Sequence, residues 1–145
     1  MITIKIDRLS NKVLIHIKDL DKKSKRALWK SNIENGKELE RETKRLILNG
    51  PKTGRLYKNK DGSWHQASAP GQAPANRSGK LYKSTGFKVR NWREFEIGEY
   101  GVEHAKMEHN WGRIKARPHL IKAIENKKWD MAKNIEVELK RELKH

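Results

Sequence analysis

The sequence predicts an α+β fold with a long N-terminal helix, a small antiparallel sheet, a long C-terminal helix and an extended Pro/Ala/Gly arm. Three observations support this prediction. Apolar residues recur with helical spacing near both ends of the chain, short alternating runs lie in the middle, and a stretch rich in proline and alanine interrupts them. Since 145 residues is the length of one ordinary domain, we expect a single domain, residues 1–145, which contains the arm, residues 66–79.

The N-terminal residues favour a β-hairpin. Ile2–Ile6 alternates apolar and polar residues with the period of a strand, and Lys12–Ile17 is rich in β-branched residues. Turn-forming residues, among them Asp7 and Asn11, lie between the two runs. We therefore expect two short strands before the first helix.

The first helix is expected to begin after Asp19 or Asp21, either of which is a suitable N-cap, and to run to about Leu48. Its apolar residues occupy two adjoining faces, diluted by polar residues and a glycine. The first face holds Leu28, Asn32, Asn35, Leu39 and Leu46, and the second holds Trp29, Ile33, Gly36, Thr43 and Ile47.

Two glycines carry specific expectations for this helix. Glycine in a helix interior costs about 1 kcal/mol relative to alanine, so Gly36 marks either a bend or a close approach to another subunit. At the C-terminal end, Gly50 suits the left-handed conformation and Pro51 cannot continue the helix.

The middle of the chain predicts two pairs of antiparallel strands. Lys60-Asp61-Gly62 is a turn signal between short runs on either side, which indicates a hairpin within 55–65. Phe87–Arg90 and Arg93–Ile97 read as the second pair. Residues 99–112 are ambiguous, and we expect a short helix followed by a loop.

The C-terminal segment predicts a helix that Pro118 opens, because proline suits the first helical turn. We place Leu120 in the core. The helical stripe continues to the end of the chain through Ile121, Ile124, Met131, Ile135, Leu139 and Leu143.

The arm between the two pairs of strands is the most unusual segment of the sequence. If residues 67–78 adopt a polyproline II conformation at ~3.1 Å per residue, they span roughly 37 Å, well beyond a domain radius of gyration of ~15 Å. The arm is therefore expected to reach a neighbouring subunit. The residues proposed for that assembly contact are Ala69, Pro70, Gly71, Pro74 and Ala75.

Charge is concentrated around the same region. The net charge is +16, which favours nucleic acid, an anionic membrane or an acidic protein as partner, although a lysine-rich composition can also reflect the genome. Between Gly50 and Arg93 the only acidic residue is Asp61, and ten basic residues are interleaved with the aromatic residues Tyr57, Trp64, Tyr82 and Trp92. These candidates for contact with DNA or an acidic partner are Lys52, Arg55, Lys58, Lys60, Arg77, Lys80, Lys83, Lys88, Arg90 and Arg93.

No pattern in the sequence indicates catalysis. The chain has no cysteine, which excludes disulfides and thiolate metal sites. His104 and His109 are five residues apart and do not share a helix face as a zinc pair would. No serine lies in a nucleophile elbow. We therefore expect a protein that is not an enzyme and that has neither a catalytic residue, a metal nor a cofactor.

The hydropathy of the chain gives no sign of export or of a membrane role. No apolar run is long enough for a signal peptide, and none approaches the ~20 residues of a membrane span. We expect a soluble protein made in the cytoplasm, with no membrane partner.

Several motifs, in order, resemble a known family. Pro51-Lys52-Thr53-Gly54-Arg55 follows the first helix, and the arm contains Ala67-Ser68-Ala69-Pro70-Gly71-Gln72-Ala73-Pro74-Ala75. Ser78-Gly79-Lys80-Leu81 leads into strands, and Ala116-Arg117-Pro118-His119-Leu120 opens the last helix. Together they resemble the small neck and tail-completion proteins of long-tailed phages, also described as head–tail joining or tail-component proteins. His119 replaces an aromatic residue that is usual in that family.

The resemblance implies a virion structural protein at the head–tail junction or tail top, made in the host cytoplasm, which assembles with itself as a ring. It also implies contacts with a neck connector and with tail tube or terminator proteins, and phage DNA in the lumen. The helix-start motif consists of Arg117, Pro118 and Leu120, and we expect Arg117 to pair with a carboxylate. The competing hypothesis is a free basic nucleic-acid-binding protein, which requires the basic surface but neither the arm nor the Arg-Pro motif.

Overall fold

The computed structural model describes residues 10–101 and 115–144 and confirms the α+β class. A long helix, α1 (Ser10–Asn49), precedes a first hairpin of β1 (Leu56–Lys58) and β2 (Trp64–Gln66). The short helix α2 (Lys80–Ser84) leads into a second hairpin of β3 (Thr85–Val89) and β4 (Phe95–Glu99), and the described chain closes with α3 (Leu120–Leu143). The two hairpins form two separate two-stranded antiparallel sheets. The sequence had predicted a single small sheet.

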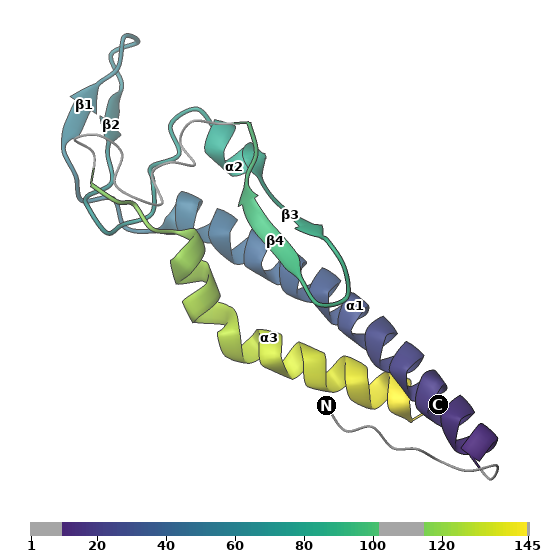
Figure 1. The fold of residues 1–145 in the computed structure, drawn as a ribbon. Helices are drawn as coiled ribbons and strands as arrows, with labels where there is room; N and C mark the ends of the chain where they lie inside the picture. Colours follow the sequence, from purple (N-terminus) through teal and green to yellow (C-terminus); the bar gives the residue numbers. More distant parts are fainter. Residues whose placement is uncertain (1–9, 102–114, 145) are drawn as a thin grey trace.

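Helix α1 is the central element of the molecule. Figure 1 shows α3 running antiparallel to α1 on one side, while β3 and β4 lie along the opposite side of α1. The first hairpin stands beyond the C-terminal end of α1, away from the helix pair. This arrangement places the hairpin of β1 and β2 at one end of an elongated molecule.

The contact between α1 and α3 is unusually polar. Asn35, buried on α1, donates to the carbonyl of Met131 at 3.4 Å and accepts from Asn134 at 2.9 Å. Nearer the other end of the contact, Asn126 donates to Glu42 at 2.7 Å. Because buried amides and carboxylates are costly unless their partners align, these bonds favour one register of the two helices.

The opposite side of α1 receives the second hairpin through close contact at Gly36. A Cβ built at this glycine would lie 2.2 Å from Cδ2 of Phe87, so only glycine admits the aromatic ring. Asn32 on the same face donates to the carbonyls of Asn91 and Trp92 in the turn between β3 and β4. The close approach at Gly36 is therefore made by a strand of the same domain rather than by another subunit.

Local turn chemistry confirms both predicted hairpins. Gly62 has a φ of 87°, the left-handed value that its turn requires. In the second hairpin, Phe87 is opposite Ile97 and Val89 is opposite Phe95, which puts these apolar side chains on a common face. Helix α2 is an element that the sequence analysis did not predict.

The prediction of an N-terminal hairpin is wrong for its second strand, the part that the structure describes. Residues 12–17 belong to α1, and residues 2–6 lie outside the described chain. β-branched residues lower helix propensity only slightly, and extending an existing helix is cheap compared with nucleating a separate element. The helix therefore begins before both proposed caps.

Two predictions about helix ends also need correction. Gly50 is absent from the glycines with positive φ, and its N–H bonds to the carbonyl of Leu46 at 3.0 Å as in a helix, so Pro51 rather than Gly50 stops α1. Helix α3 begins at Leu120 with His119 as N-cap, so Pro118 lies just before the helix. The expected helix at 99–112 is absent from residues 99–101, and the rest of that range lies outside the described residues.

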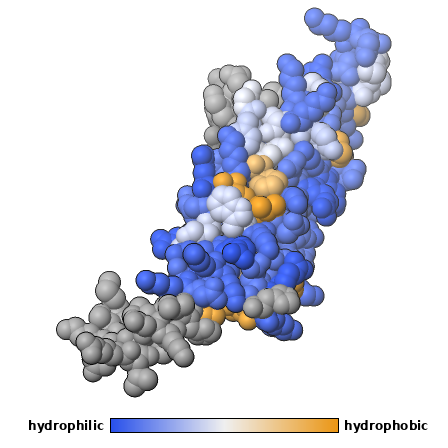
Figure 2. All heavy atoms as spheres, turned by 90° about the vertical axis from the view of Figure 1, so that its right-hand side faces the viewer, coloured by the Kyte–Doolittle hydropathy of each residue, from blue (hydrophilic) through white to orange (hydrophobic). Residues whose placement is uncertain are grey.

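The core is small for a chain of this length. In the described part of the chain six hydrophobic residues are buried, and three of them are alanines, whereas twelve large hydrophobic side chains are exposed. Figure 2 shows hydrophilic side chains over most of one face, with small apolar patches between them. Leu120 is half-buried rather than a core residue.

Candidate functional site

The arm folds back onto its own domain at a turn. Pro70 and Gly71 form the turn, Gly71 adopts a φ of 79°, and Gln72 donates its N–H to the carbonyl of Ala69 at 3.1 Å. The N–H of Gly71 bonds to the carbonyl of Ala116 at 3.0 Å, and Lys122 on α3 donates to the carbonyl of Gly71. Apart from Gln66, the last residue of β2, the arm contains neither helix nor strand, and its turn at Pro70-Gly71 means that residues 67–78 are not a continuous polyproline II segment.

Gln72 fastens the arm to the segment that follows α1. Its Oε1 accepts from the N–H of Thr53 at 3.0 Å and from the N–H of Ala69 at 2.8 Å, and its Nε2 donates to the hydroxyl of Thr53 at 2.8 Å. One side chain therefore holds both the arm and the residues before the first hairpin. The sequence alone gave no sign of this role for Gln72, because its partners precede it by nineteen residues (Thr53) and by three (Ala69).

Arg117 joins the arm to the start of α3. Its Nε donates to the hydroxyl of Ser68 at 3.1 Å, and its Nη1 donates to the carbonyl of Lys115 at 2.8 Å. The prediction that Arg117 pairs with a carboxylate is wrong for the described residues, because hydroxyl and carbonyl oxygens of the arm and the adjacent chain take its donors. The motifs Ala67–Ala75 and Ala116–Leu120 thus meet in space.

The five proposed arm residues differ in their exposure. Pro74 is buried, Ala69 and Ala75 are half-buried, and only the turn residues Pro70 and Gly71 are exposed. Of these five residues, only Pro70 and Gly71 therefore offer exposed surface to a partner. A contact between this turn and a neighbouring subunit stays a prediction.

The ten predicted basic residues do not form one surface. Arg55, Lys58 and Lys60 belong to the first hairpin, and Arg77 lies beside it. Lys52 follows α1, where it donates to the carbonyl of Leu46 at 3.4 Å, and burial lowers the pKa of its ammonium group. The others lie on α2 (Lys80, Lys83), on β3 (Lys88), and at the turn between β3 and β4 (Arg90, Arg93).

The cations of the second hairpin are engaged by the domain itself. Arg90 pairs with Glu96 at 2.7 Å, Lys88 lies 4.3 Å above the ring centre of Tyr100, and Arg93 lies 4.5 Å from that of Trp92. By contrast, no carboxylate within residues 10–101 and 115–144 forms an ion pair with Arg55, Lys58, Lys60 or Arg77. These four cations at the first hairpin, like the exposed Lys80 and Lys83 on α2, are therefore not held by an ion pair within the described residues.

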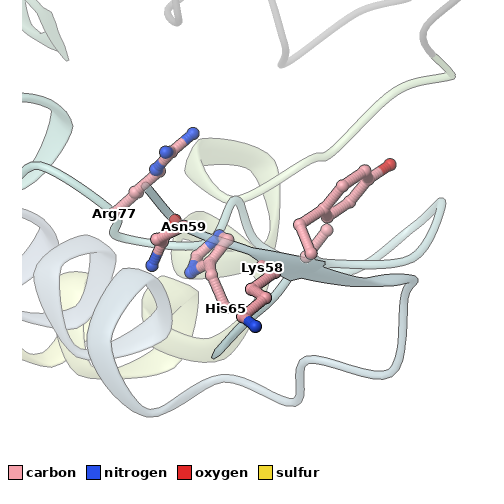
Figure 3. Close-up of a pocket in the computed structure, with 6 residues that line it drawn as sticks. Lys58, Asn59, His65 and Arg77 are labelled. Atoms are coloured by element: carbon pink, nitrogen blue, oxygen red, sulfur yellow. The ribbon is translucent and has the colours of Figure 1, made fainter. Parts of the chain in front are cut away.

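A hollow of about 350 Å³ lies at the base of that hairpin. In Figure 3, Asn59 and His65 lie between Arg77 on one side and Lys58 on the other. The remaining lining residues are Tyr57 and Ala67. Next to the hollow, Trp64 exposes 67% of its surface and Leu56 exposes 55%, so the hairpin combines unpaired cations with exposed apolar rings and chains.

A buried ionisable pair anchors the start of α3, and the sequence analysis missed it. His119 bonds through Nε2 to the carboxyl group of Glu99 at the end of β4, and its Nδ1 lies 2.9 Å from the carbonyl of Arg117. A carbonyl only accepts, so Nδ1 is the donor of that hydrogen bond. Both side chains are inaccessible to solvent, so the pair fastens β4 to α3 rather than forming a site.

The structure offers no metal site among the residues it describes. No cluster of three or more histidine or acidic residues within 10–101 and 115–144 has the geometry to hold an ion. The predicted absence of a metal at His104 and His109 concerns residues outside the described chain. None of the described helices combines the length and hydropathy needed to cross a membrane.

Comparison with known proteins adds no further assignment. No protein-family model, curated protein or solved structure matches this chain.

Proposed function

We propose that this chain is a structural protein of the neck or tail top of a long-tailed phage, acting in head–tail joining or tail completion rather than in catalysis. It assembles as a ring through which DNA passes, between a neck connector and the tail tube or terminator proteins. The observation that supports this proposal best is the exposure of large apolar side chains on two separate elements of a chain with a small core.

These exposed side chains lie on different surfaces of the molecule. Leu56, Tyr57 and Trp64 project from the first hairpin at one end, and Ile121 and Trp129 lie on α3. Trp129 alone exposes 77% of its surface. Apolar patches on monomers usually mark contact sites, and two unlike patches support a head-to-tail contact, which closes into a ring when the rotation between subunits permits.

The docking of the arm supports the assignment to this class of phage proteins. The motifs that carry the resemblance are far apart in the sequence, yet Ser68 bonds to Arg117, and Gly71 bonds to Ala116. Their contact gives a physical reason for the two motifs to occur together. It also presents the Pro70-Gly71 turn at the surface, where a neighbouring subunit is able to bind it.

Electron microscopy of a phage that lacks the gene tests this proposal. In a phage genome that encodes the chain, deletion of the gene should yield DNA-filled heads and separate tails, and expression in trans should restore joined particles. Particles that remain intact and infectious after deletion would contradict the neck role. A variant that carries Arg117→Ala should restore fewer joined particles than one that carries Lys140→Ala, because Lys140 only pairs with Glu136 one helical turn away on an exposed face.

The first hairpin also supports a second candidate, a free basic nucleic-acid-binding protein. Its unpaired cations and exposed Tyr57 and Trp64 are the groups that bind phosphates and stack on bases. Light scattering with and without duplex DNA distinguishes the candidates. A free DNA-binding protein stays monomeric and binds tightly with strong salt dependence, whereas a neck protein associates with itself and binds DNA weakly.

A further inference from the structure

We propose that residues 2–6 of one subunit add as a strand to the outer edge of β4 in a neighbouring subunit. This contact rests on the proposed self-assembly and deepens it, because it names the segment that one subunit extends and the surface that the next subunit offers. Addition of a strand is a common way for a sheet edge to bind an extended peptide. It joins two unlike surfaces, as a head-to-tail contact requires.

The outer edge of β4 has unpaired backbone groups. Tyr100 donates its N–H to the carbonyl of Ser84 at 3.0 Å, which fixes the alternation of bonded and non-bonded pairs along the second hairpin. Phe95, Ile97 and Glu99 therefore direct their N–H and carbonyl groups away from β3. In the part of the chain that the structure describes, no backbone hydrogen bond from outside the hairpin reaches these groups. A two-stranded sheet with such an edge is a template for a third strand.

Solvent reaches this edge. The side chain of Glu99 is inaccessible, because it is bonded to His119, yet the residue as a whole is only half-buried. The surface that Glu99 exposes therefore belongs to its main chain. Gly98 beside it has no side chain to shield the strand, and an added Cβ there would have no atom within 4 Å. The main chain of β4 is thus open to an extended segment.

The segment before α1 has the pattern of a half-buried strand. Ile2, Ile4 and Ile6 alternate with Thr3 and Lys5. These residues precede the described chain, which begins with α1 at residue 10. Their five positions match the five residues of β4 in length. Residues 2–6 therefore supply an apolar face and a free backbone of the right extent for this edge.

The first turns of α1 carry this segment away from its own sheet. Residues 18–22 are all exposed, and Figure 1 shows this end of α1 extending past the turn between β3 and β4. Asn32, which bonds to that turn, lies about 33 Å along the helix from Ser10, at ~1.5 Å per residue. Residues 2–9 span at most about 29 Å when fully extended. Residues 2–6 therefore cannot lie along β4 of their own chain, and a second copy has to supply the edge.

Charge selects β4 rather than β3, and it selects the register. On the face of the second hairpin that points away from α1, β4 carries Glu96 while β3 carries Lys88. With the isoleucines on the face toward α1, an antiparallel register pairs Lys5 with Glu96. Glu96 also bonds to Arg90, and a carboxylate has acceptor sites for both cations. On the edge of β3, Lys5 would instead meet Lys88, and like charges across strands are unfavourable.

Disulfide cross-linking tests the contact, since the chain has no cysteine of its own. A mixture of the Lys5→Cys and Glu96→Cys chains should give a covalent dimer under mild oxidation, because facing residues of an antiparallel pair bring their Cβ atoms to about 4.5–5.5 Å. One chain that carries both changes should give a ladder of covalent oligomers.

The matched control replaces Glu96→Cys by Lys88→Cys, the facing position on β3. Its mixture with Lys5→Cys should cross-link with less than about a tenth of the yield. Equal yields from the two mixtures would overturn the assignment to the edge of β4. A chain carrying Lys5→Cys and Glu96→Cys that closes a disulfide within its own monomer would also overturn the proposal.

Proline substitution tests the hydrogen-bond ladder without a change of charge. In the proposed register Ile4 is opposite Ile97 and donates its N–H to β4, so Ile4→Pro should raise the concentration of half-association about 10-fold in analytical ultracentrifugation. Thr3→Pro is the control, because the N–H of Thr3 faces solvent at the new edge, and its effect should be less than about 2-fold. Equal effects of the two prolines would show that residues 2–6 do not pair as a strand. Circular dichroism melts check that both variants retain the fold.

These outcomes are distinguishable from failure of the neck role. If gene deletion separates heads from tails and the chain forms a closed oligomer, but Lys5→Cys and Glu96→Cys do not cross-link, the proposed function stands and this contact falls. If the two variants cross-link but deletion leaves particles intact, the contact stands and the neck role falls.

Discussion

At the scale of single residues, Glu42 shows how a polar side chain stabilises the contact between the two long helices. It is 6% exposed and lies on α1, where Arg45 donates to both of its oxygens at 2.7 Å and Asn126 of α3 donates at 2.7 Å. These hydrogen bonds, chiefly those from Arg45, lower the pKa of Glu42 from its ordinary value of 4.5. The folded state therefore favours the ionised carboxylate.

The pKa of Glu42 predicts a specific loss of stability in acid. Because the folded-state pKa lies below the unfolded one, the stabilisation is complete above the ordinary carboxyl value and is lost as pH falls through the lowered value. Glu42→Gln should reduce the free energy of unfolding by about 1–2 kcal/mol at pH 7 and by less at about pH 3. Urea denaturation across this pH range measures the effect.

The control for that experiment is Glu34→Gln, a change of an exposed carboxylate on the same helix. It should alter stability by less than about 0.5 kcal/mol at pH 7. If Glu42→Gln followed the acid dependence of the wild type, the carboxylate of Glu42 would have no part in holding α3 to α1.

At the scale of elements, α1 packs against two different elements, α3 and β3, through two adjacent residues. Asn35 faces α3 and Gly36 faces β3, because successive residues of a helix point about 100° apart. The helix therefore needs a polar residue on one side and the absence of a side chain on the other. This explains why its apolar faces are interrupted at these positions.

The contact between Gly36 and Phe87 predicts that Gly36→Ala destabilises the protein despite the better helix propensity of alanine. The gain of about 1 kcal/mol in propensity is opposed by overpacking of about 1–3 kcal/mol, because the added methyl group would meet the ring of Phe87. Thermal and urea unfolding should show a net loss. Combining the change with Phe87→Leu should cost less than the sum of the two single changes.

Gly98→Ala provides a matched comparison on β4, where an added Cβ would have no atom within 4 Å. We expect it to be close to neutral, within about 0.5 kcal/mol. A stabilising Gly36→Ala would show that the second hairpin leaves space over α1 and would remove the structural reason for the glycine.

At the scale of the whole molecule, the surface has more large apolar side chains than the core. Buried hydrophobic residues in the described chain are Ala27, Leu39, Ile47, Ala73, Leu81 and Ala123, while four tryptophan and tyrosine side chains, Trp29, Tyr57, Trp64 and Trp129, expose 43% to 77%. Polar bonds between α1 and α3 compensate in part for the small core. The remaining apolar surface favours association with other protein chains.

Self-association is the prediction that belongs to this scale. Analytical ultracentrifugation at increasing protein concentration should show a closed oligomer of a single size, and Trp129→Ser should shift its formation to higher concentration. In a head-to-tail contact the first hairpin of one subunit meets α3 of the next, so Trp64→Ser should also shift oligomer formation to higher concentration. Lys133→Ala, on the exposed side of α3, serves as the control. A wild-type chain that is monomeric at every concentration would contradict self-assembly and favour the free nucleic-acid-binding protein.

Much of the secondary structure could be predicted because it depends on neighbouring residues. The Asp61-Gly62 turn predicted the first hairpin, the short runs on either side of Asn91-Trp92 predicted the second, and helical spacing predicted the two long helices. The N-terminal hairpin failed because a run of β-branched residues fits a helix when the following residues already form one. Helix α2 was missed because its single turn is too short to show a period.

The sequence predicted which residue types the candidate site contains, but not which of those residues lie together. Local counting found the basic residues and the aromatic residues among them, but it could not show that Arg90 is paired with Glu96 while Arg77 joins the hairpin. It also found the motifs of Ala67–Ala75 and Ala116–Leu120 without indicating that Arg117 bonds to Ser68 across them. Both facts depend on contacts between residues many positions apart.

The sequence by itself determined the α+β class, the two hairpins, the two long helices and the strong positive charge, because periodicity, turn residues and composition are local properties. Only the tertiary structure decided that the arm lies on its own domain, that Phe87 occupies the space beside Gly36, and that Arg77 lies beside the first hairpin. These features arise from packing between elements, where shape and hydrogen-bond partners from distant residues choose among arrangements that the local pattern permits equally.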